Sequence, residues 1–161
     1  LMFCFFLGHA PMTDSILIIE DTRTMAELYA KYLSSEGRVA EIANSGKTGL
    51  AMVSEKNYAA IILDLNLPDM DGLFILRHIQ MAHPHTPVIV VTAYGSVGAA
   101  ADAMKFGAFD FIMKPFPSAR LNATIKVAVD YAKIKNELQE LKNNMFDNLK
   151  NLPHAAMTVV P

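Results

Sequence analysis

Asp64 has the surroundings expected of a reactive carboxylate. It directly follows the apolar run at residues 60–63, and a loop containing Pro68 then leads to Gly72. A short apolar run bounded by turn residues is typical of a strand buried on both faces. Open α/β sheets place their chemistry at the carboxyl ends of such strands. The sequence therefore predicts that Asp64 lies at a functional sheet edge.

Four other polar residues also stand at the ends of short apolar runs. They are Glu20 and Asp21 after residues 16–19, Thr92 after residues 88–91, and Lys114 after residues 111–113. The carboxyl ends of parallel strands meet at one edge of a sheet. We therefore expect three acids, a hydroxyl and an amine to gather there.

Three neighbouring carboxylates repel one another unless a cation lies between them. Mg²⁺ suits such a site because it prefers hard oxygen ligands and keeps several waters. We expect Asp21 and Asp64 to ligate Mg²⁺, with Glu20 nearby or holding a ligand water. The backbone carbonyl of Asn66 would add a further oxygen. One oxygen of Asp64 would remain free to attack a phosphorus atom.

Lys114 and Thr92 complete a set suited to phosphoryl transfer, which depends mainly on charge neutralisation and positioning. The Lys114 ammonium would bind one phosphoryl oxygen, and the Thr92 hydroxyl would donate to another. The product would be an acyl phosphate on Asp64. Because this group carries more charge than the carboxylate, Thr92 and the neighbouring loops should move toward it.

Alternating patterns predict five strands and five helices that position these groups. We expect strands near residues 15–19, 38–43, 59–64, 87–92 and 109–113, separated by helices from Thr22 to Gly37 and over 47–56, 71–82 and 96–106. Pro117 is expected to open the last helix within its first turn. Such alternation predicts an α/β fold with a parallel sheet covered on both faces.

The last helix continues past the expected end of the domain. Apolar residues recur at three- and four-residue spacing: Tyr131, Ile134, Leu138, Leu141 and Met145. This seam spans about two heptads and indicates a dimerising or signalling linker at 133–150. The other interpretation is an amphipathic helix lying on its own domain. Residues 151–161 show no periodicity and are expected to form a disordered tail.

The composition suits one domain with an extension. The chain has 161 residues, a net charge of −2 and one cysteine, Cys4. The charge gives no reason to expect direct binding to nucleic acid, and the cysteine usage fits a reducing, cytoplasmic location. No apolar run is long enough for a membrane span. Residues 1–13 are interpreted as a leader or added segment before a domain at 14–132.

The ordered motifs resemble the receiver domains of two-component response regulators over residues 14–133. Glu20-Asp21, Asp64, Thr92-Ala93, Phe111 and Lys114-Pro115 match the family's acidic pair, phospho-acceptor, switch hydroxyl, switch aromatic and lysine-proline pair. The resemblance implies a flavodoxin-like, doubly wound sheet in the order 2-1-3-4-5. It also implies a cis peptide before Pro115. A histidine kinase or phosphotransfer protein would supply the phosphoryl group.

Residues 92–96 and 103–111 are similar to the receivers of NtrC-like activators of sigma-54-dependent transcription. Those proteins carry a helical linker, an ATPase and a DNA-binding domain after the receiver. DNA binding would therefore need a domain not present in this chain. We expect a homodimer through the surface of the fourth helix, fifth strand and fifth helix, together with the 131–145 seam. The alternatives are a stand-alone receiver acting by protein–protein interaction and a non-phosphorylated dimerisation module.

The sequence favours a switch over a turnover enzyme. A haloacid dehalogenase-type phosphatase needs a second acid two residues after its aspartate nucleophile, where this chain has Asn66. Without that acid the phospho-aspartate should persist. We further hypothesise that bulky Tyr94 slows its hydrolysis. A P-loop is excluded because Glu41 stands where its first glycine belongs.

Overall fold

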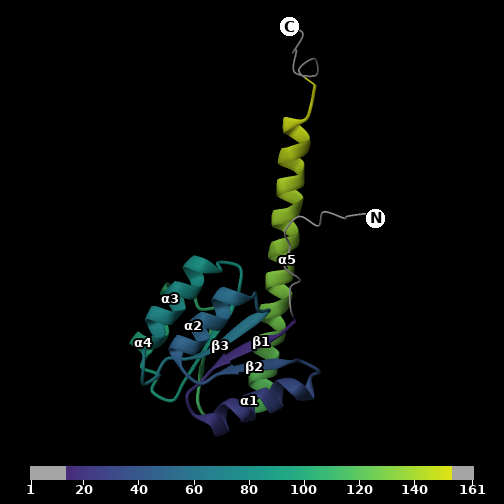
Figure 1. Ribbon diagram of the computed structural model, residues 1–161. Helices are drawn as coiled ribbons and strands as arrows, with labels where there is room; N and C mark the ends of the chain where they lie inside the picture. Colours follow the sequence, from purple (N-terminus) through teal and green to yellow (C-terminus); the bar gives the residue numbers. More distant parts are fainter. Residues whose placement is uncertain (1–13, 154–161) are drawn as a thin grey trace, which may run out of the picture.

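A computed structural model describes residues 14–153 and contains one five-stranded parallel sheet in the order β2-β1-β3-β4-β5 (Figure 1). The strands are β1 (Ile16–Ile19), β2 (Ala40–Ala43), β3 (Ala60–Asp64), β4 (Val88–Thr92) and β5 (Asp110–Met113). The predicted fold class and strand order are confirmed. The three central strands are fully buried, as their continuous apolar runs predict.

Five helices alternate with the strands and cover both faces of the sheet. They are α1 (Arg23–Ser35), α2 (Gly46–Glu55), α3 (Gly72–Ala82), α4 (Val97–Lys105) and α5 (Ser118–Lys150). Side chains of β1 alternate between two cores. Ile18 joins a core with α1 and α5, and Leu17 joins one with α2, α3 and α4.

Strand register brings the polar strand ends to one edge of the sheet. Ile19 pairs with Leu63, so Glu20 and Asp64 follow neighbouring positions on adjacent strands. Asp64 pairs with Val91, which places Thr92 one residue farther along β4. Residues from distant parts of the sequence therefore meet because the sheet is parallel.

Several predicted boundaries were wrong by one or two residues. β2 begins at Ala40 and not at residue 38, and α2 ends at Glu55. Asp71 and Ser96 are N-caps outside α3 and α4, because their side chains accept hydrogen bonds from backbone N–H groups of the first turn. Pro117 is likewise the N-cap of α5 and does not lie in its first turn.

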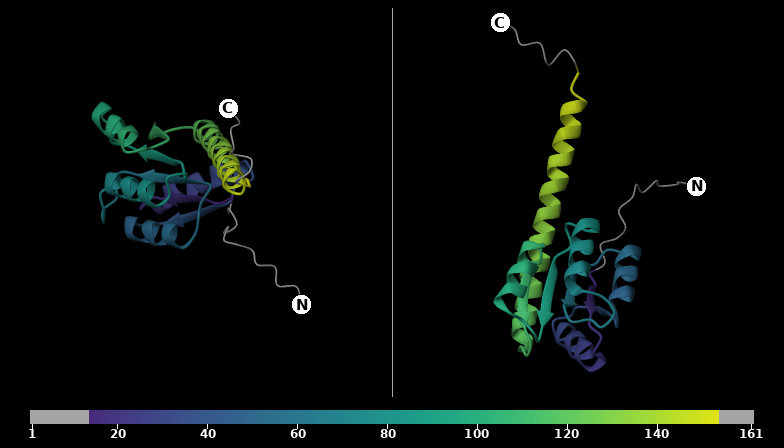
Figure 2. Two further views of the ribbon diagram at one scale, coloured as in Figure 1. Left: turned by 90° about the horizontal axis from the view of Figure 1, so that it is seen from above. Right: turned by 90° about the vertical axis from the view of Figure 1, so that its left-hand side faces the viewer.

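The helix α5 runs without interruption from the sheet into a projecting rod (Figure 2). Its last buried residue is Ala132. The predicted seam lies on this helix with each of its five side chains at least half exposed, from Leu138 at 51% to Ile134 and Leu141 at 65%. The part of α5 after Ala132 therefore does not lie on its own domain, and the alternative interpretation is wrong for this part of the helix.

The predicted leader, up to residue 13, and the end of the predicted tail, 154–161, lie outside the described residues. Within residues 14–153, no helix combines the length and apolar character that a membrane crossing needs.

Candidate functional site

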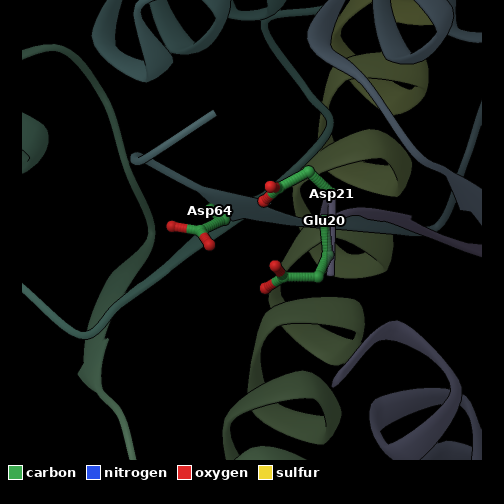
Figure 3. Close-up of side chains that lie close together, drawn as sticks. All are labelled: Glu20, Asp21 and Asp64. Atoms are coloured by element: carbon green, nitrogen blue, oxygen red, sulfur yellow. The ribbon is translucent and has the colours of Figure 1, made fainter. Parts of the chain in front are cut away.

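The structure brings the three predicted carboxylates together at the carboxyl ends of β1 and β3 (Figure 3). One oxygen from each of Glu20, Asp21 and Asp64 lies within 4.8 Å of the others. Glu20 and Asp64 are buried, at 1% and 5% exposure, whereas Asp21 is exposed. Glu20 and Asp64 thus form the buried floor of the site, and Asp21 lies on its solvent-exposed side.

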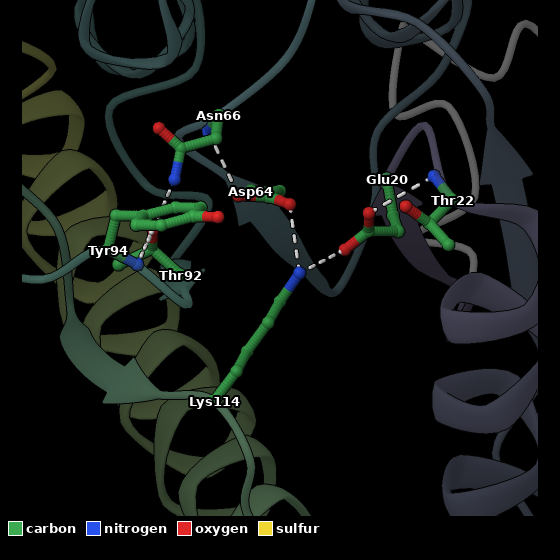
Figure 4. Close-up of polar contacts among 7 residues, drawn as sticks. All are labelled: Glu20, Thr22, Asp64, Asn66, Thr92, Tyr94 and Lys114. Carbon is green, nitrogen blue, oxygen red and sulfur yellow. Dashed lines mark hydrogen bonds and ion pairs between the residues drawn. The ribbon is translucent and has the colours of Figure 1, made fainter.

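Lys114 supplies the cation that this cluster needs. Its Nζ donates to Glu20 Oε2 at 2.5 Å and to Asp64 Oδ2 at 2.9 Å (Figure 4). The residue follows β5, and its peptide bond to Pro115 is cis, as the resemblance implied. An ammonium group between two buried carboxylates offsets their mutual repulsion.

Burial and charge act in opposite directions on these groups. Burial raises the pKa of Glu20, and the hydrogen bond from Lys114 opposes that rise while the Asp64 charge adds to it. Burial lowers the pKa of Lys114, but hydrogen bonds and charges from Asp64 and Glu20 outweigh it and raise the pKa overall. Lys114 therefore stays protonated at neutral pH.

Thr92 ends β4 beside Asp64, with its side chain fully buried. Its Oγ1 accepts hydrogen bonds from Asn66 Nδ2 at 2.8 Å and from the Tyr94 backbone N–H at 3.3 Å (Figure 4). The predicted switch hydroxyl therefore has two protein partners in this conformation. Asn66 was expected to supply a backbone carbonyl and to replace the second acid of a phosphatase, and its side-chain contact with Thr92 was not predicted.

The loop after Asp64 is fixed by hydrogen bonds to carboxylates. Asn66 N donates to Asp64 Oδ1 at 2.9 Å, and Asp69 accepts from the backbone N–H groups of Gly46 and Lys47 at 3.0 and 2.9 Å. Asp69 thus ties this loop to the start of α2. This contact could not be predicted from the sequence, because its partners lie more than twenty positions away and are backbone N–H groups.

Gly72 closes the same loop at a close backbone approach. A Cβ atom there would lie 2.4 Å from Leu65 Cα and 2.7 Å from Leu65 O. Since both atoms belong to the backbone, a larger residue would displace the loop that follows Asp64.

Phe111 lies half-buried on β5 and packs against the core under α2, α3 and α4. A Cβ atom at Gly95 would lie 3.0 Å from two atoms of the Phe111 ring and 2.1 Å from Met113 Sδ. The ring thus packs directly beneath the loop that follows Thr92. A movement of that loop would therefore displace both Met113 and Phe111.

The oxygen donors suit a hard divalent cation. Glu20, Asp21 and Asp64 can each offer one carboxylate oxygen to a common point, and Asp21 faces solvent. Mg²⁺ needs few protein ligands and keeps several waters, so an open site of this kind fits it.

Comparisons with known proteins agree with this geometry. Residues 16–126 match the response regulator receiver domain family. The chain is 36% identical over 130 residues to the luminescence regulatory protein LuxO of Vibrio campbellii, covering 80% of this chain and 29% of LuxO. It is 33% identical over 146 residues to a putative NtrX-like response regulator of Rickettsia bellii, covering 89% of this chain and 30% of that protein.

Solved structures give the same result. The receiver domain of a putative LuxO repressor protein from Vibrio parahaemolyticus has a TM-score of 0.75 and 31% identity, over 79% of this chain and 98% of that one. NtrX from Brucella abortus has a TM-score of 0.75 and 32% identity, over 81% of this chain and 30% of that one. The curated relatives are thus about three times as long as the matched part. This chain belongs to the response regulator receiver domain family.

Proposed function

We propose that Asp64 accepts a phosphoryl group from a histidine kinase or phosphotransfer protein. The observation that carries this proposal is the pairing of the buried Asp64 carboxylate with Lys114 at 2.9 Å, next to the exposed Asp21. A carboxylate held in this way has a fixed direction of attack and a cation beside it. Phosphoryl transfer requires both features.

In this proposal, Asp21, Asp64 and the Asn66 backbone carbonyl would hold Mg²⁺, with Glu20 nearby or holding a ligand water. The bound ion would supply charge neutralisation on the phosphoryl oxygens. An Asp64 carboxylate oxygen forms a bond to phosphorus as the bond from phosphorus to the donor histidine nitrogen breaks. The electron pair and any proton taken up stay with that histidine.

Lys114 and Thr92 then bind the new phosphoryl oxygens. Lys114 exchanges its contact with the carboxylate for one with the phosphoryl group, and the Thr92 hydroxyl turns from Asn66 toward it. The loop that contains Gly95 then moves together with Thr92. This movement displaces Phe111, because Gly95 packs on the Phe111 ring. The surface formed by α4, β5 and α5 reports the change.

We also propose that residues 14–132 form the receiver and residues 133–150 form a linker that carries output, such as sigma-54-dependent transcription. The last buried residue of α5, Ala132, supports this boundary. The exposed seam supports a homodimer that joins α5 and the α4–β5–α5 surface. DNA would be contacted only through a further domain. A stand-alone receiver acting by protein–protein interaction is the alternative.

We propose that the protein acts as a cytoplasmic switch and not as a turnover enzyme. Two residues after Asp64, the side chain is the amide of Asn66, which cannot serve as the general base that a phosphatase of the dehalogenase type needs. Tyr94, which is 81% exposed near Thr92, is proposed to slow attack by water. Autophosphorylation and slow dephosphorylation are the only reactions expected.

Intact-protein mass after incubation with acetyl phosphate and Mg²⁺ tests the proposal. We expect one added phosphoryl group, absent without Mg²⁺ and absent in Asp64→Asn. Asp102→Asn, which changes an exposed acid on α4, is the matched control and should be phosphorylated normally. Absence of added mass in folded wild-type protein would favour the non-phosphorylated dimerisation module.

A further inference from the structure

Tyr29 carries a buried hydroxyl group that the resting fold leaves without a partner. The residue lies in α1, is 1% exposed, and its Oη has no hydrogen-bond partner among residues 14–153. An unpaired buried hydroxyl destabilises a fold. A phenylalanine would fill the same core space without that cost, so packing alone does not explain a tyrosine here.

The ring of Tyr29 lies under the segment that carries Lys114. Lys114 Nζ is 5.8 Å from the ring centroid, and the Phe116 ring stacks on Tyr29 with centroids 5.1 Å apart. Stacking on Phe116 explains why an aromatic ring stands at position 29, but the Phe116 side chain has no atom that could form a hydrogen bond with the Tyr29 hydroxyl. The Tyr29 ring therefore lies near Lys114, which pairs with Glu20 at the floor of the site.

Electrostatics agree with that placement. Burial raises the pKa of Tyr29 to about 12, the Lys114 charge lowers it, the Glu20 charge raises it, and the approach of the Lys114 ammonium to the hydroxyl lowers it further. The hydroxyl thus keeps its proton at neutral pH and is influenced by both charged partners. Although attracted to Lys114, it does not meet the geometry of a hydrogen bond in this conformation.

We propose that Tyr29 is a positioning residue for phosphoryl transfer: its hydroxyl donates a hydrogen bond to Glu20 when Lys114 moves from Glu20 to the phosphoryl group on Asp64. This inference rests on the proposed function. No covalent bond to Tyr29 forms, and its proton stays on the phenol oxygen.

The need for a second donor follows from the burial of Glu20. In the resting conformation its carboxylate accepts from Lys114 Nζ at 2.5 Å and from Thr22 N at 3.1 Å. When Lys114 turns to the phosphoryl group, a carboxylate that is 1% exposed loses its ammonium donor and keeps only Thr22 N and, in the proposed function, a water of the Mg²⁺ site. A buried carboxylate with too few donors is costly. The spare donor of Tyr29 would lower that cost only in the phosphorylated state.

Tyr58 is a matched control for Tyr29. It is also buried, at 5% exposure, and burial also raises its pKa to about 12. Its hydroxyl contacts Glu41 of β2, and its other acidic neighbour is Glu55 at the end of α2, so neither belongs to the Asp64 site. Removing its hydroxyl therefore tests the loss of a buried phenol without touching the site.

The experiment compares Tyr29→Phe, Tyr58→Phe and wild type by the rate of mass gain with acetyl phosphate at saturating Mg²⁺. Loss of a hydrogen bond to a charged group should slow Tyr29→Phe about tenfold. The melting temperature of unphosphorylated Tyr29→Phe should equal or exceed that of wild type, because its hydroxyl has no partner in that state. Tyr58→Phe should keep the wild-type rate.

A spectroscopic readout on wild-type protein makes the test independent of the folding of the variant. With ¹³Cζ-tyrosine label and Mg²⁺, beryllofluoride, a phosphoryl mimic, should shift the Tyr29 resonance and leave that of Tyr58 in place. The inference would be overturned if Tyr29→Phe were phosphorylated at the wild-type rate or had a clearly lower melting temperature than wild type. It would also be overturned if beryllofluoride left the Tyr29 resonance unmoved. Failure of wild type itself to gain mass would instead refute the proposed function.

Discussion

Asn66 Nδ2 donates a hydrogen bond to Thr92 Oγ1 across 2.8 Å, joining the loop after the proposed acceptor to the proposed switch hydroxyl. Tyr94 N donates to the same oxygen at 3.3 Å. The hydroxyl is therefore held on the Asn66 side of the site before any phosphoryl group arrives. Phosphorylation must supply enough interaction energy to replace these contacts.

The Asn66→Ala variant should become phosphorylated faster than the wild-type protein. The substitution removes one neutral hydrogen bond that stabilises only the resting position of Thr92, worth ~1 kcal/mol, or about fivefold in rate. The initial rate of mass gain with acetyl phosphate measures this. Asn122→Ala, which loses a hydrogen bond from α5 to the Tyr32 backbone carbonyl in α1, is the control. A slower Asn66→Ala protein would show that the side chain assists transfer instead.

Lys114→Met should lower the free energy of unfolding by roughly 3–5 kcal/mol, the usual cost of breaking a buried ion pair. The substitution leaves Glu20 and Asp64 buried without their shared cation. Mg²⁺ should restore part of the loss, because it provides another cation at the same carboxylates. Urea denaturation with and without Mg²⁺ measures both effects.

Lys56→Met provides the comparison for Lys114→Met. Lys56 pairs with Glu41, and both side chains are about one-third exposed, at 36% and 34%. Such partly exposed pairs contribute about 0–1 kcal/mol. Equal losses in the two variants, or no response of Lys114→Met to Mg²⁺, would contradict the role given to Lys114.

The sequence predicted the groups that stand at strand ends but not the contacts between loops. Asp64, Thr92 and Lys114 each follow an apolar run, so a parallel sheet necessarily brings them to one edge. The hydrogen bonds of Asp69 depend instead on how the β3–α3 loop meets the backbone of α2. Backbone N–H groups have no sequence signature, and for this reason such contacts could not be predicted.

Tyr29 illustrates a second limit of the sequence. It lies with Ala26 and Leu33 on the face of α1 that is buried, at the spacing of an amphipathic helix. The helical spacing of buried residues does not distinguish a tyrosine from a phenylalanine at a core position. Only the three-dimensional structure shows that the hydroxyl lies near Lys114 without a partner.

Asp69→Asn should make stability less dependent on pH in the acid range. Hydrogen bonds from Gly46 N and Lys47 N lower the pKa of Asp69 below its ordinary value of 3.8. A lowered folded-state pKa gives stability that is present above 3.8 and is lost as the pH falls through the folded-state value. Wild type should therefore be the more stable protein at neutral pH, and the difference should shrink below pH 3.8.

Denaturation curves of wild type and Asp69→Asn across this pH range provide the measurement. Asp102→Asn changes an exposed acid in α4 and serves as the control. A stability difference that grows as the solution becomes more acidic would contradict the structural role of Asp69.

Leu138→Lys should weaken any dimer formed through the rod of α5. Leu138 is the central residue of the seam and is 51% exposed in the single chain. A charge at this position would have to be buried in a paired helix, at a large cost. Sedimentation equilibrium should show a higher dissociation constant than wild type, whereas Asn143→Lys, outside the seam, should not. Equal association of both variants would place the dimer contact elsewhere.

Trapping the acyl phosphate identifies the residue that accepts the phosphoryl group, which we propose to be Asp64. After acetyl phosphate and Mg²⁺ treatment, borohydride reduces a phospho-aspartate to homoserine, which peptide mass mapping locates in the sequence. We predict homoserine at position 64 alone, dependent on Mg²⁺. Homoserine at position 21 or 69, or none in folded protein that gains no mass, would contradict the account.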